Sequence, residues 1–307
     1  MSMAFVFPGQ GSQYVGMGER IYNTYQEAKL VFEEASEALG FNMAELCFLG
    51  PKEELNKTYR TQPAIVTVST AFYRILKKRG IEPTAVAGHS LGEYSALVAA
   101  EVLSLADAVR LTEKRGRLMQ EAVPEGKGLM AAILGLSREV VDEVCLSVTS
   151  GYVAPANYNC PGQIVIAGEK EAVEEAIALA RESGAKRAIT LAVSAPSHCA
   201  LMIEASRALA EELKNIGFRP PRVPIVNNAD AIFLNTVDSI KASLVKQLDS
   251  PLLWEDSIRT MVDSGIDTFV EVGPGRVLSG LIKRIDSSVS VYNTDEELQK
   301  IIETFAK

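Results

Sequence analysis

The pentapeptide Gly88-His89-Ser90-Leu91-Gly92 has residue types and spacing suited to nucleophilic catalysis. It fits the pattern Gly-X-Ser-X-Gly, in which a sharp turn between a strand and a helix exposes a serine hydroxyl. Residues 84–87 predict the strand and residues 91–100 the helix, so the required context is present. A free backbone N–H of Leu91 would stabilise a developing oxyanion. We therefore predict that Ser90 is a nucleophile, with a plain tight turn as the alternative.

A serine nucleophile needs a general base, and the chain contains only two histidines. His89 is adjacent to the serine, and neighbouring side chains in an extended turn point apart, so it is badly placed. His198 takes the role by elimination, although it could merely cap its loop. Cys199 is a competing nucleophile with the same geometric difficulty beside His198, and Cys160 is expected to be a small packed side chain.

Arg115 lies on the apolar stripe of a helix predicted over residues 105–121. A buried guanidinium needs a partner, because an unpaired buried charge is expensive. An internal salt bridge or a stem that reaches water would explain it. The alternative is that the Arg115 guanidinium binds a substrate carboxylate through two parallel hydrogen bonds. That second interpretation would distinguish a transferase of carboxylated acyl groups from a general esterase.

Two glycine-rich loops follow predicted strands. In Gly9-Gln10-Gly11 the glycines would let the backbone N–H of Gln10 reach into a site, since ligands of open α/β sheets lie beyond the carboxyl ends of strands. The loop is not a dinucleotide fingerprint, because Tyr14 occupies the place of the third glycine. For Gly273-Pro274-Gly275 we favour a simple tight turn.

The elements that must position these residues alternate between strands and helices, which predicts a parallel sheet covered on both faces. Residues 22–39 and 64–79 predict two of the helices. The middle of the chain reads βαββαβ, the order of a ferredoxin-like unit. We expect a large α/β body from residues 1–123 and 196–307, with an inserted subdomain over residues 124–195.

Composition narrows the class of protein further. The 307 residues carry a formal net charge of −8, which argues against nucleic-acid binding. The four cysteines lack the spacing of zinc ligands or of a disulfide framework, so we expect no metal and a reducing compartment. We find no signal peptide and no uncharged stretch of transmembrane length. The sequence therefore predicts a cytoplasmic protein without a membrane partner.

The chain resembles the malonyl-CoA:acyl carrier protein transacylases of type II fatty acid synthesis. The resemblance covers essentially the whole chain and rests on six ordered motifs, with Arg115 placed 25 residues after the serine. The motifs are Pro8-Gly9-Gln10-Gly11-Ser12-Gln13, Gly88-His89-Ser90-Leu91-Gly92-Glu93-Tyr94, Asn157-Tyr158-Asn159-Cys160-Pro161-Gly162-Gln163, Val193-Ser194-Ala195-Pro196-Ser197-His198, Val226-Asn227-Asn228 and Glu271-Val272-Gly273-Pro274-Gly275.

The resemblance implies an α/β-hydrolase-like core with an inserted ferredoxin-like subdomain. It also implies that Ser90 is the nucleophile and His198 its base. The backbone N–H groups of Gln10 and Leu91 would form the oxyanion hole. Arg115 would bind the free carboxylate of malonate. The family orients its histidine through a glutamine backbone carbonyl, and Gln247 occupies the matching position.

The implied reaction is ping-pong transfer of malonyl from malonyl-CoA to the phosphopantetheine thiol of acyl carrier protein, with no cofactor of the enzyme's own. The carrier protein is acidic, so it would dock on a local basic patch, with Lys186, Arg187, Lys283 and Arg284 as candidates. A polyketide carrier protein as acceptor, a serine thioesterase or hydrolase, and a non-catalytic module that binds carrier protein are the alternatives.

Overall fold

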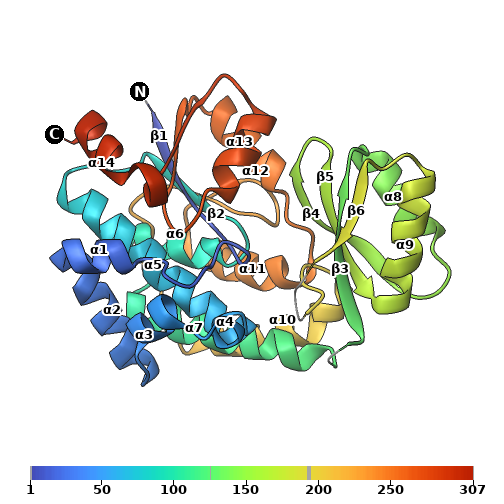
Figure 1. Ribbon diagram of the computed structural model, residues 1–307, viewed down its shortest axis with the longest axis horizontal. Helices are drawn as coiled ribbons and strands as arrows, with labels where there is room; N and C mark the ends of the chain where they lie inside the picture. Colours follow the sequence, from blue (N-terminus) through green and yellow to red (C-terminus); the bar gives the residue numbers. More distant parts are fainter. Residues whose placement is uncertain (1, 125, 192–194, 307) are drawn as a thin grey trace.

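Two β-sheets organise the chain in the computed structural model, which describes residues 2–124, 126–191 and 195–306 (Figure 1). The large sheet has the strand order β10-β9-β1-β2-β7-β8. Its strands are parallel except for β8, which pairs antiparallel with β7 at one edge. The strands are β1 (Met3–Phe7), β2 (Ala85–Gly88), β7 (Ile225–Val226), β8 (Phe233–Leu234), β9 (Thr268–Glu271) and β10 (Ser290–Asn293).

Strand β1 shows why this sheet is covered on both faces. All five of its residues are buried. Phe5 and Phe7 pack into a core on one face, whereas Ala4 and Val6 pack into a second core on the other. Helices α12 (Trp254–Asp263) and α13 (Val277–Ile285) supply the second core.

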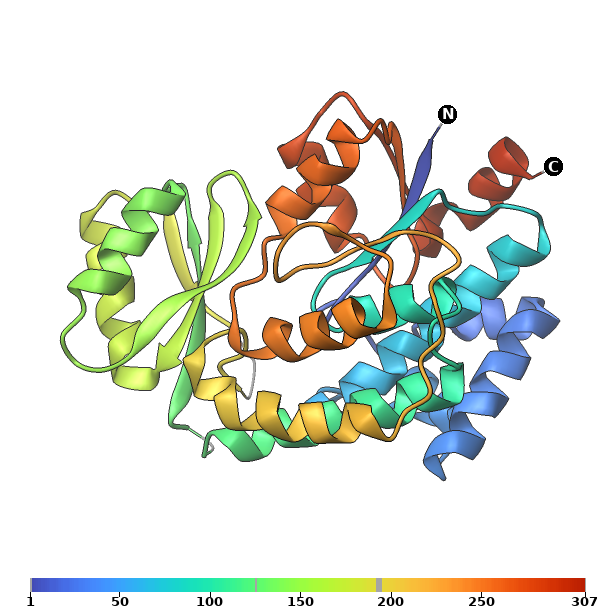
Figure 2. The ribbon, with the colours of Figure 1, turned by 180° about the vertical axis from the view of Figure 1, so that it is seen from behind.

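The first core is larger and is built by the remaining helices of the large body. Figure 2 shows α10 running beside α7 below the sheet. These helices are α1 (Glu19–Thr24), α2 (Gln26–Leu39), α3 (Met43–Leu49), α4 (Lys52–Leu55), α5 (Thr58–Lys78), α6 (Gly92–Ala99), α7 (Leu105–Ala122), α10 (Ile203–Lys214), α11 (Val237–Asp249) and α14 (Thr294–Phe305), with a 3₁₀ turn over Ala200–Met202.

The small sheet is antiparallel, with strand order β4-β5-β3-β6, and lies at one end of the molecule (Figure 1). Helices α8 (Arg138–Ser147) and α9 (Lys170–Glu182) pack on one face of it around a separate core. The chain order βαββαβ predicted from the sequence is therefore confirmed. The strands are β3 (Gly128–Leu134), β4 (Val153–Cys160), β5 (Gln163–Glu169) and β6 (Arg187–Thr190).

The other face of the small sheet is turned toward the large body. Met130, Ala156 and Val165 on this face share a core with Cys199, which comes after the chain has left the sheet. The expected boundaries of the inserted subdomain, residues 124 and 195, stay a prediction. The core beneath α8 and α9 is separate from the cores of the large body, and this supports a distinct structural unit between residues 124 and 195.

Two details of the predicted elements are wrong. The helix expected over residues 22–39 is two helices, because Tyr25 has an extended backbone with φ −120° and ψ 127°. The helix expected over residues 64–79 starts at Thr58 and continues through Pro63, whose missing N–H is offset by the burial of most of α5. In the part of the chain that the structure describes, no helix has the length and apolarity needed to cross a bilayer.

Candidate active site

Three glycine contacts shape the turn that carries Ser90. A Cβ on Gly88 would lie 1.9 Å from the carbonyl carbon of Gly92, and one on Gly92 would lie 2.1 Å from the oxygen of Phe7. A Cβ on Gly9 would lie 2.4 Å from the oxygen of His89. The turn can therefore approach the end of β1 only with glycines at these positions. Ser90 adopts a left-handed φ of 52°, the strained conformation that the motif predicts.

The hydroxyl of Ser90 lies against His198. Ser90 Oγ is 2.8 Å from His198 Nε2, and His198 Nδ1 is 2.7 Å from the backbone oxygen of Gln247. The carbonyl can only accept, so Nδ1 carries the proton and Nε2 is free to accept one from Ser90. Burial, helped by the charge of Arg115, lowers the pKa of His198 to about 3. The histidine is therefore neutral at ordinary pH.

The rival groups are placed where they cannot act on Ser90. His89 Nε2 is 2.8 Å from Asn159 Oδ1, and its ring stacks edgewise on Trp254. The Cys199 thiol donates to the Pro196 backbone oxygen, and burial raises its pKa to about 11. Cys160 packs in the core beneath α12 and α13, as the sequence predicts.

Arg115 is fully buried, with 1% of its surface exposed, so its guanidinium does not reach water. Its Nη1 donates to Gln62 Oε1 at 2.9 Å, and its Nη2 donates to Gln247 Oε1 at 3.0 Å. Nη2 also lies 3.3 Å from Ser90 Oγ. Among the described residues, no carboxylate is within ion-pair distance of Arg115. Two explanations for Arg115 on an apolar helix face are thus contradicted for the described chain. It forms no internal salt bridge, and its side chain does not extend to carry the guanidinium into water.

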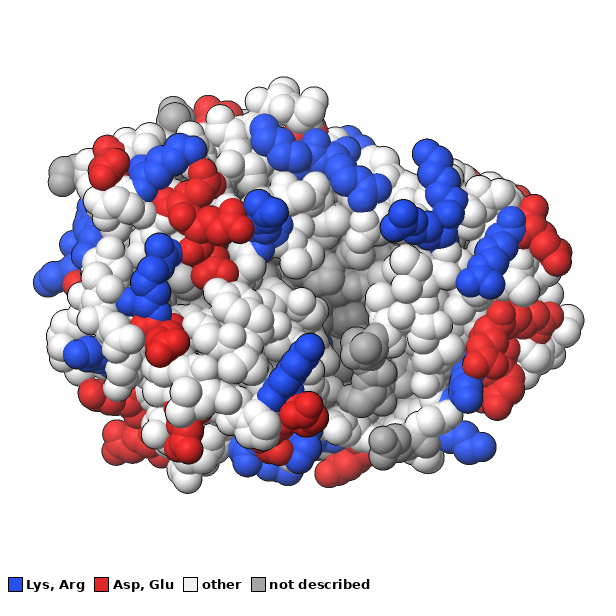
Figure 3. Space-filling view, in the orientation of Figure 1, with Lys and Arg blue, Asp and Glu red and all other residues white. Residues whose placement is uncertain are grey.

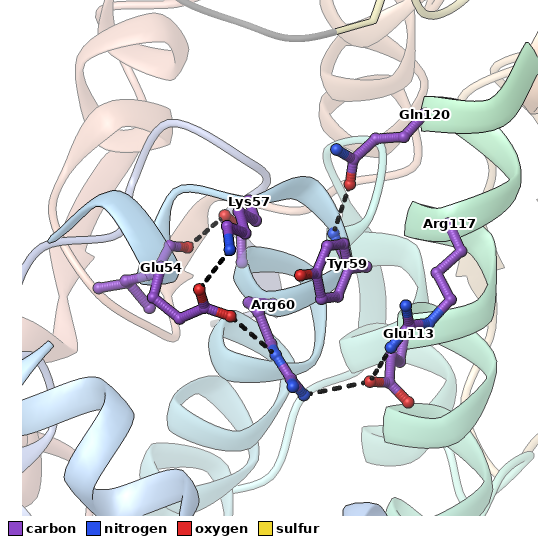
Figure 4. A network of polar contacts seen from close by, with 9 residues as sticks. Glu54, Lys57, Tyr59, Arg60, Glu113, Arg117 and Gln120 are labelled. Atoms are coloured by element: carbon purple, nitrogen blue, oxygen red, sulfur yellow. Dashed lines mark hydrogen bonds and ion pairs between the residues drawn. The ribbon is translucent and has the colours of Figure 1, made fainter. Parts of the chain in front are cut away.

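The partners of Arg115 depend on close packing of α5 against α7. A Cβ on Gly116 would lie 2.5 Å from the Cα of Tyr59, so glycine is required for this approach. Figure 4 shows the polar network that ties the same helices together. Arg60 joins Glu54 and Glu113 in this network, while Gln120 Oε1 accepts from the Tyr59 backbone N–H.

A cavity of about 210 Å³ opens between the large body and the small sheet, with Ser90, His198 and Arg115 in its wall. Figure 3 shows the surface hollow between the two bodies, with Lys and Arg side chains on both sides of its upper end. The other lining residues are Gly9, Gln10, Gly11, Ser12, Thr58, His89, Met119, Met130, Asn157, Asn159, Gln163, Val165, Leu191, Ala195, Ser197, Val277, Leu278 and Leu281.

The two predicted oxyanion donors are both near the serine. Leu91 directly precedes α6, and Gln10 lines the cavity. Neither backbone N–H donates a hydrogen bond to another group in the described chain. The loop over Gly273-Pro274-Gly275 is a bend, and the Gly273 backbone N–H donates to Thr294 Oγ1. Within residues 2–124, 126–191 and 195–306, no cluster of side chains suits a metal ion.

Sequence reasoning did not assign roles to three polar residues around the serine. Gln62 lies outside the motifs, although a glutamine on the buried face of a helix is a usable signal. Glu93 and Asn228 lie within the motifs, but the resemblance implies no role for them. The structure brings Glu93 against Gln247 and Asn228, and brings Asn228 Oδ1 within 2.7 Å of the Ser90 backbone nitrogen.

Comparisons with known proteins agree with this arrangement. The family described as "Acyl transferase domain" matches residues 4–300. The malonyl CoA-acyl carrier protein transacylase of Escherichia coli K12 is 52% identical over 95% of this chain and 96% of its own. The Bacillus subtilis protein of the same name is 49% identical over 92% of this chain and 90% of its own.

Solved structures show the same fold. The acyl carrier protein S-malonyltransferase of Vibrio cholerae superposes with a TM-score of 0.95 and 45% identity, covering 98% of this chain and 100% of that one. A malonyl-transacylase in complex with its type II PKS acyl-carrier protein gives 0.96 and 46%, covering 100% and 99%. The fold and the matched domain define an acyltransferase. This chain belongs to the family of malonyl CoA-acyl carrier protein transacylases.

Proposed function

We propose that this acyltransferase moves the malonyl group of malonyl-CoA to the thiol of acyl carrier protein, for fatty acid synthesis, through an ester on Ser90. One observation carries the assignment of residues: Ser90 Oγ lies between His198 Nε2 and the buried Arg115 Nη2. A general base and a buried guanidinium thus flank one hydroxyl. The names of the relatives support the same substrate and partner.

In the first half-reaction, His198 accepts the proton of Ser90 as Oγ attacks the malonyl thioester carbon. The backbone N–H groups of Gln10 and Leu91 stabilise the negative oxygen of the tetrahedral intermediate. The intermediate then expels the CoA thiolate, which takes the proton from His198, and leaves malonyl-Ser90. In the second half-reaction the carrier-protein thiol gives its proton to His198 and attacks the ester. Ser90 leaves and regains the proton.

Arg115 supplies the selection for malonyl groups. Its two terminal nitrogens present parallel donors that a carboxylate accepts in a fork. In the free enzyme these donors are held by neutral amide oxygens of Gln62 and Gln247, which do not balance the charge. A malonyl carboxylate does balance it, whereas an acetyl group leaves the guanidinium without an anion.

We propose that the acidic carrier protein docks on the exposed basic residues Lys186, Arg187, Lys283 and Arg284. All four are exposed, on a chain whose net charge is −8. Arg284 donates to Gln163 Oε1 at 2.6 Å, and Gln163 lines the cavity, which puts this positive charge beside the opening. Opposite charge at the rim would guide an acidic partner to the cavity.

The proposed steps use only side chains and backbone of this chain, so we propose that no cofactor is needed. We also propose a cytoplasmic location and no nucleic-acid or membrane partner. The four cysteines, all unpaired, fit a reducing compartment. A hydrolase is disfavoured because a neutral carbonyl, rather than a carboxylate, holds His198. A polyketide carrier protein as the main acceptor is not favoured either.

Intact mass spectrometry tests the proposal directly. The protein is incubated with malonyl-, acetyl- and methylmalonyl-CoA, and then with acyl carrier protein. We expect a mass increase of one malonyl group that Ser90→Ala abolishes and that carrier protein removes. A mass that never changes would favour the non-catalytic binding module. Release of free malonate without transfer would favour the hydrolase.

A further inference from the structure

Glu93 is a buried carboxylate that the proposed chemistry does not use. It lies in the first turn of α6, three residues after Ser90, and only 3% of its surface is exposed. Among the described residues it forms no ion pair at salt-bridge distance. An acidic residue near a helix N-terminus is favourable in general, but an exposed one would serve that purpose. Burial of this carboxylate needs another explanation.

Both carboxylate oxygens accept hydrogen bonds from other elements. Oε1 accepts from the Asn228 backbone N–H at 2.9 Å, and Oε2 accepts from the side-chain Nε2 of Gln247. Gln247 and Asn228 are themselves completely buried. Burial raises the pKa of Glu93, and the hydrogen bonds from Asn228 and Gln247 and the charge of Arg115 oppose this rise by favouring the carboxylate form. Glu93 therefore joins α6 to α11 and to the loop after β7.

Asn228 and Gln247, the two partners of Glu93, also form hydrogen bonds with the backbone N–H and backbone oxygen of Ser90. Asn228 Oδ1 accepts from the Ser90 backbone N–H at 2.7 Å. Gln247 Nε2 donates to the Ser90 backbone oxygen at 3.0 Å. A residue with φ of 52° persists only where its surroundings hold it. These two hydrogen bonds are such a restraint, and Glu93 anchors both of them.

Gln247 extends the same connection to Arg115. With its nitrogen facing Glu93, the side-chain amide of Gln247 must turn its oxygen toward the guanidinium, and Oε1 accepts from Arg115 Nη2. The carboxylate of Glu93, together with the Ser90 backbone oxygen, thus favours the orientation in which this amide turns its oxygen to Arg115. If the amide turned over, an NH₂ group would face the guanidinium and displace it.

We propose that Glu93 is a positioning residue that orients the Gln247 side chain, so that Arg115 is aligned for the malonyl carboxylate while Ser90 keeps its conformation. The inference rests on the proposed function, because it assigns Arg115 to carboxylate binding. It differs from a purely structural role in one measurable way. Loss of Glu93 should change the preference between malonyl and acetyl groups. A change in stability alone would leave this preference unchanged.

The test is the rate of Ser90 acylation by malonyl-CoA and by acetyl-CoA in Glu93→Gln. The amide has the same shape but only one acceptor oxygen, so its NH₂ must face either Asn228 N–H or Gln247 Nε2. Displacement of a reacting group by about 1 Å lowers rates on the order of 100-fold. We expect kcat/KM for malonyl-CoA to fall about 100-fold and the malonyl-to-acetyl ratio to fall about tenfold.

Glu271→Gln is the matched control. Glu271 is also a fully buried carboxylate that accepts backbone N–H bonds, from Leu278 and Ser279. We expect this variant to lose stability without a change in the malonyl-to-acetyl ratio. If Glu93→Gln also keeps the wild-type ratio, whatever its Tm, the positioning role is wrong. Should Glu93→Gln not fold, Glu93→Asp, which cannot reach both partners, is measured by the same criterion.

A double variant tests the route through Gln247. Gln247→Leu removes the side-chain amide but keeps the backbone carbonyl that holds His198. If Glu93 acts through this amide, Glu93→Gln adds nothing to the selectivity loss of Gln247→Leu. Selectivity losses that multiply would overturn the inference. Failure of the wild-type enzyme to form malonyl-Ser90 would instead overturn the proposed function, so the two failures are distinguishable.

Discussion

Replacement of Arg115 by alanine separates selection of the acyl group from chemistry at the serine. The guanidinium is fully buried and within 3.3 Å of Ser90 Oγ, so a bound carboxylate would pair with it away from water. Removal of one partner from a buried, hydrogen-bonded charge pair costs about 2 to 5 kcal/mol. At about 1.4 kcal/mol for each factor of ten, kcat/KM for malonyl-CoA should fall about 30-fold to 4000-fold.

Acetyl-CoA offers no carboxylate, so its acylation rate should fall much less and the malonyl-to-acetyl ratio should drop by a similar factor. The assay is a rapid-quench time course of acyl-Ser90 formation, followed by intact mass, with each thioester. Arg115→Met, which keeps most of the side-chain volume, distinguishes lost charge from a cavity. Arg110→Ala, on the exposed face of the same helix, is the control and should leave the ratio unchanged. An unchanged ratio in Arg115→Ala would refute carboxylate binding by this residue.

Three other predictions concern packing, pH and docking. Gly116→Ala should force α5 and α7 apart, destabilising the protein by about 1 to 3 kcal/mol in urea unfolding and raising KM for malonyl-CoA. Because the pKa of His198 is about 3, the base stays neutral above that value, so single-turnover acylation should show no break near pH 6.5 between pH 5 and 7. Charge reversal at Lys283 and Arg284 should raise KM for carrier protein but spare acylation by malonyl-CoA.

Each of these predictions has a clear contrary result. A stable Gly116→Ala variant with unchanged KM would show that the helices tolerate the added methyl group. A tenfold fall in rate per pH unit below 6.5 would mean that the histidine titrates normally. If both half-reactions respond alike to the charge reversal, the docking patch is misassigned; Lys78→Glu, on α5, is a control that should affect neither.

The strongest sequence predictions were those with local causes. The turn at Ser90 depends on glycines within two residues of it, and these pack as the motif requires. Arg115 stood out because a charge broke an apolar helical stripe. The Tyr25 break and the antiparallel β8 strand were missed, because tertiary packing rather than local pattern decides them. The middle strands could be ordered because each is bounded by turn residues.

The connections around the serine were not predictable in the same way. Gln247 is 132 residues from Arg115 and 154 residues from Glu93, so no periodicity links them. The resemblance supplied only the backbone carbonyl of Gln247 as a functional atom. The role of its side chain, which contacts Arg115 and the Ser90 carbonyl, becomes visible only once the fold brings Gln247 on α11 beside Arg115 on α7 and the turn that carries Ser90.

The use of one base in both half-reactions has a consequence for the lifetime of the acyl-enzyme. Once the CoA thiol has left, His198 is again a neutral base, and it can accept a proton from whichever nucleophile reaches the ester on Ser90. A thiol, with a pKa of about 8.5, gives up that proton far more readily than water, whose pKa is about 15.7. The ester should therefore persist in solvent and react when a thiol arrives, because the acidity of the acceptor favours transfer over hydrolysis.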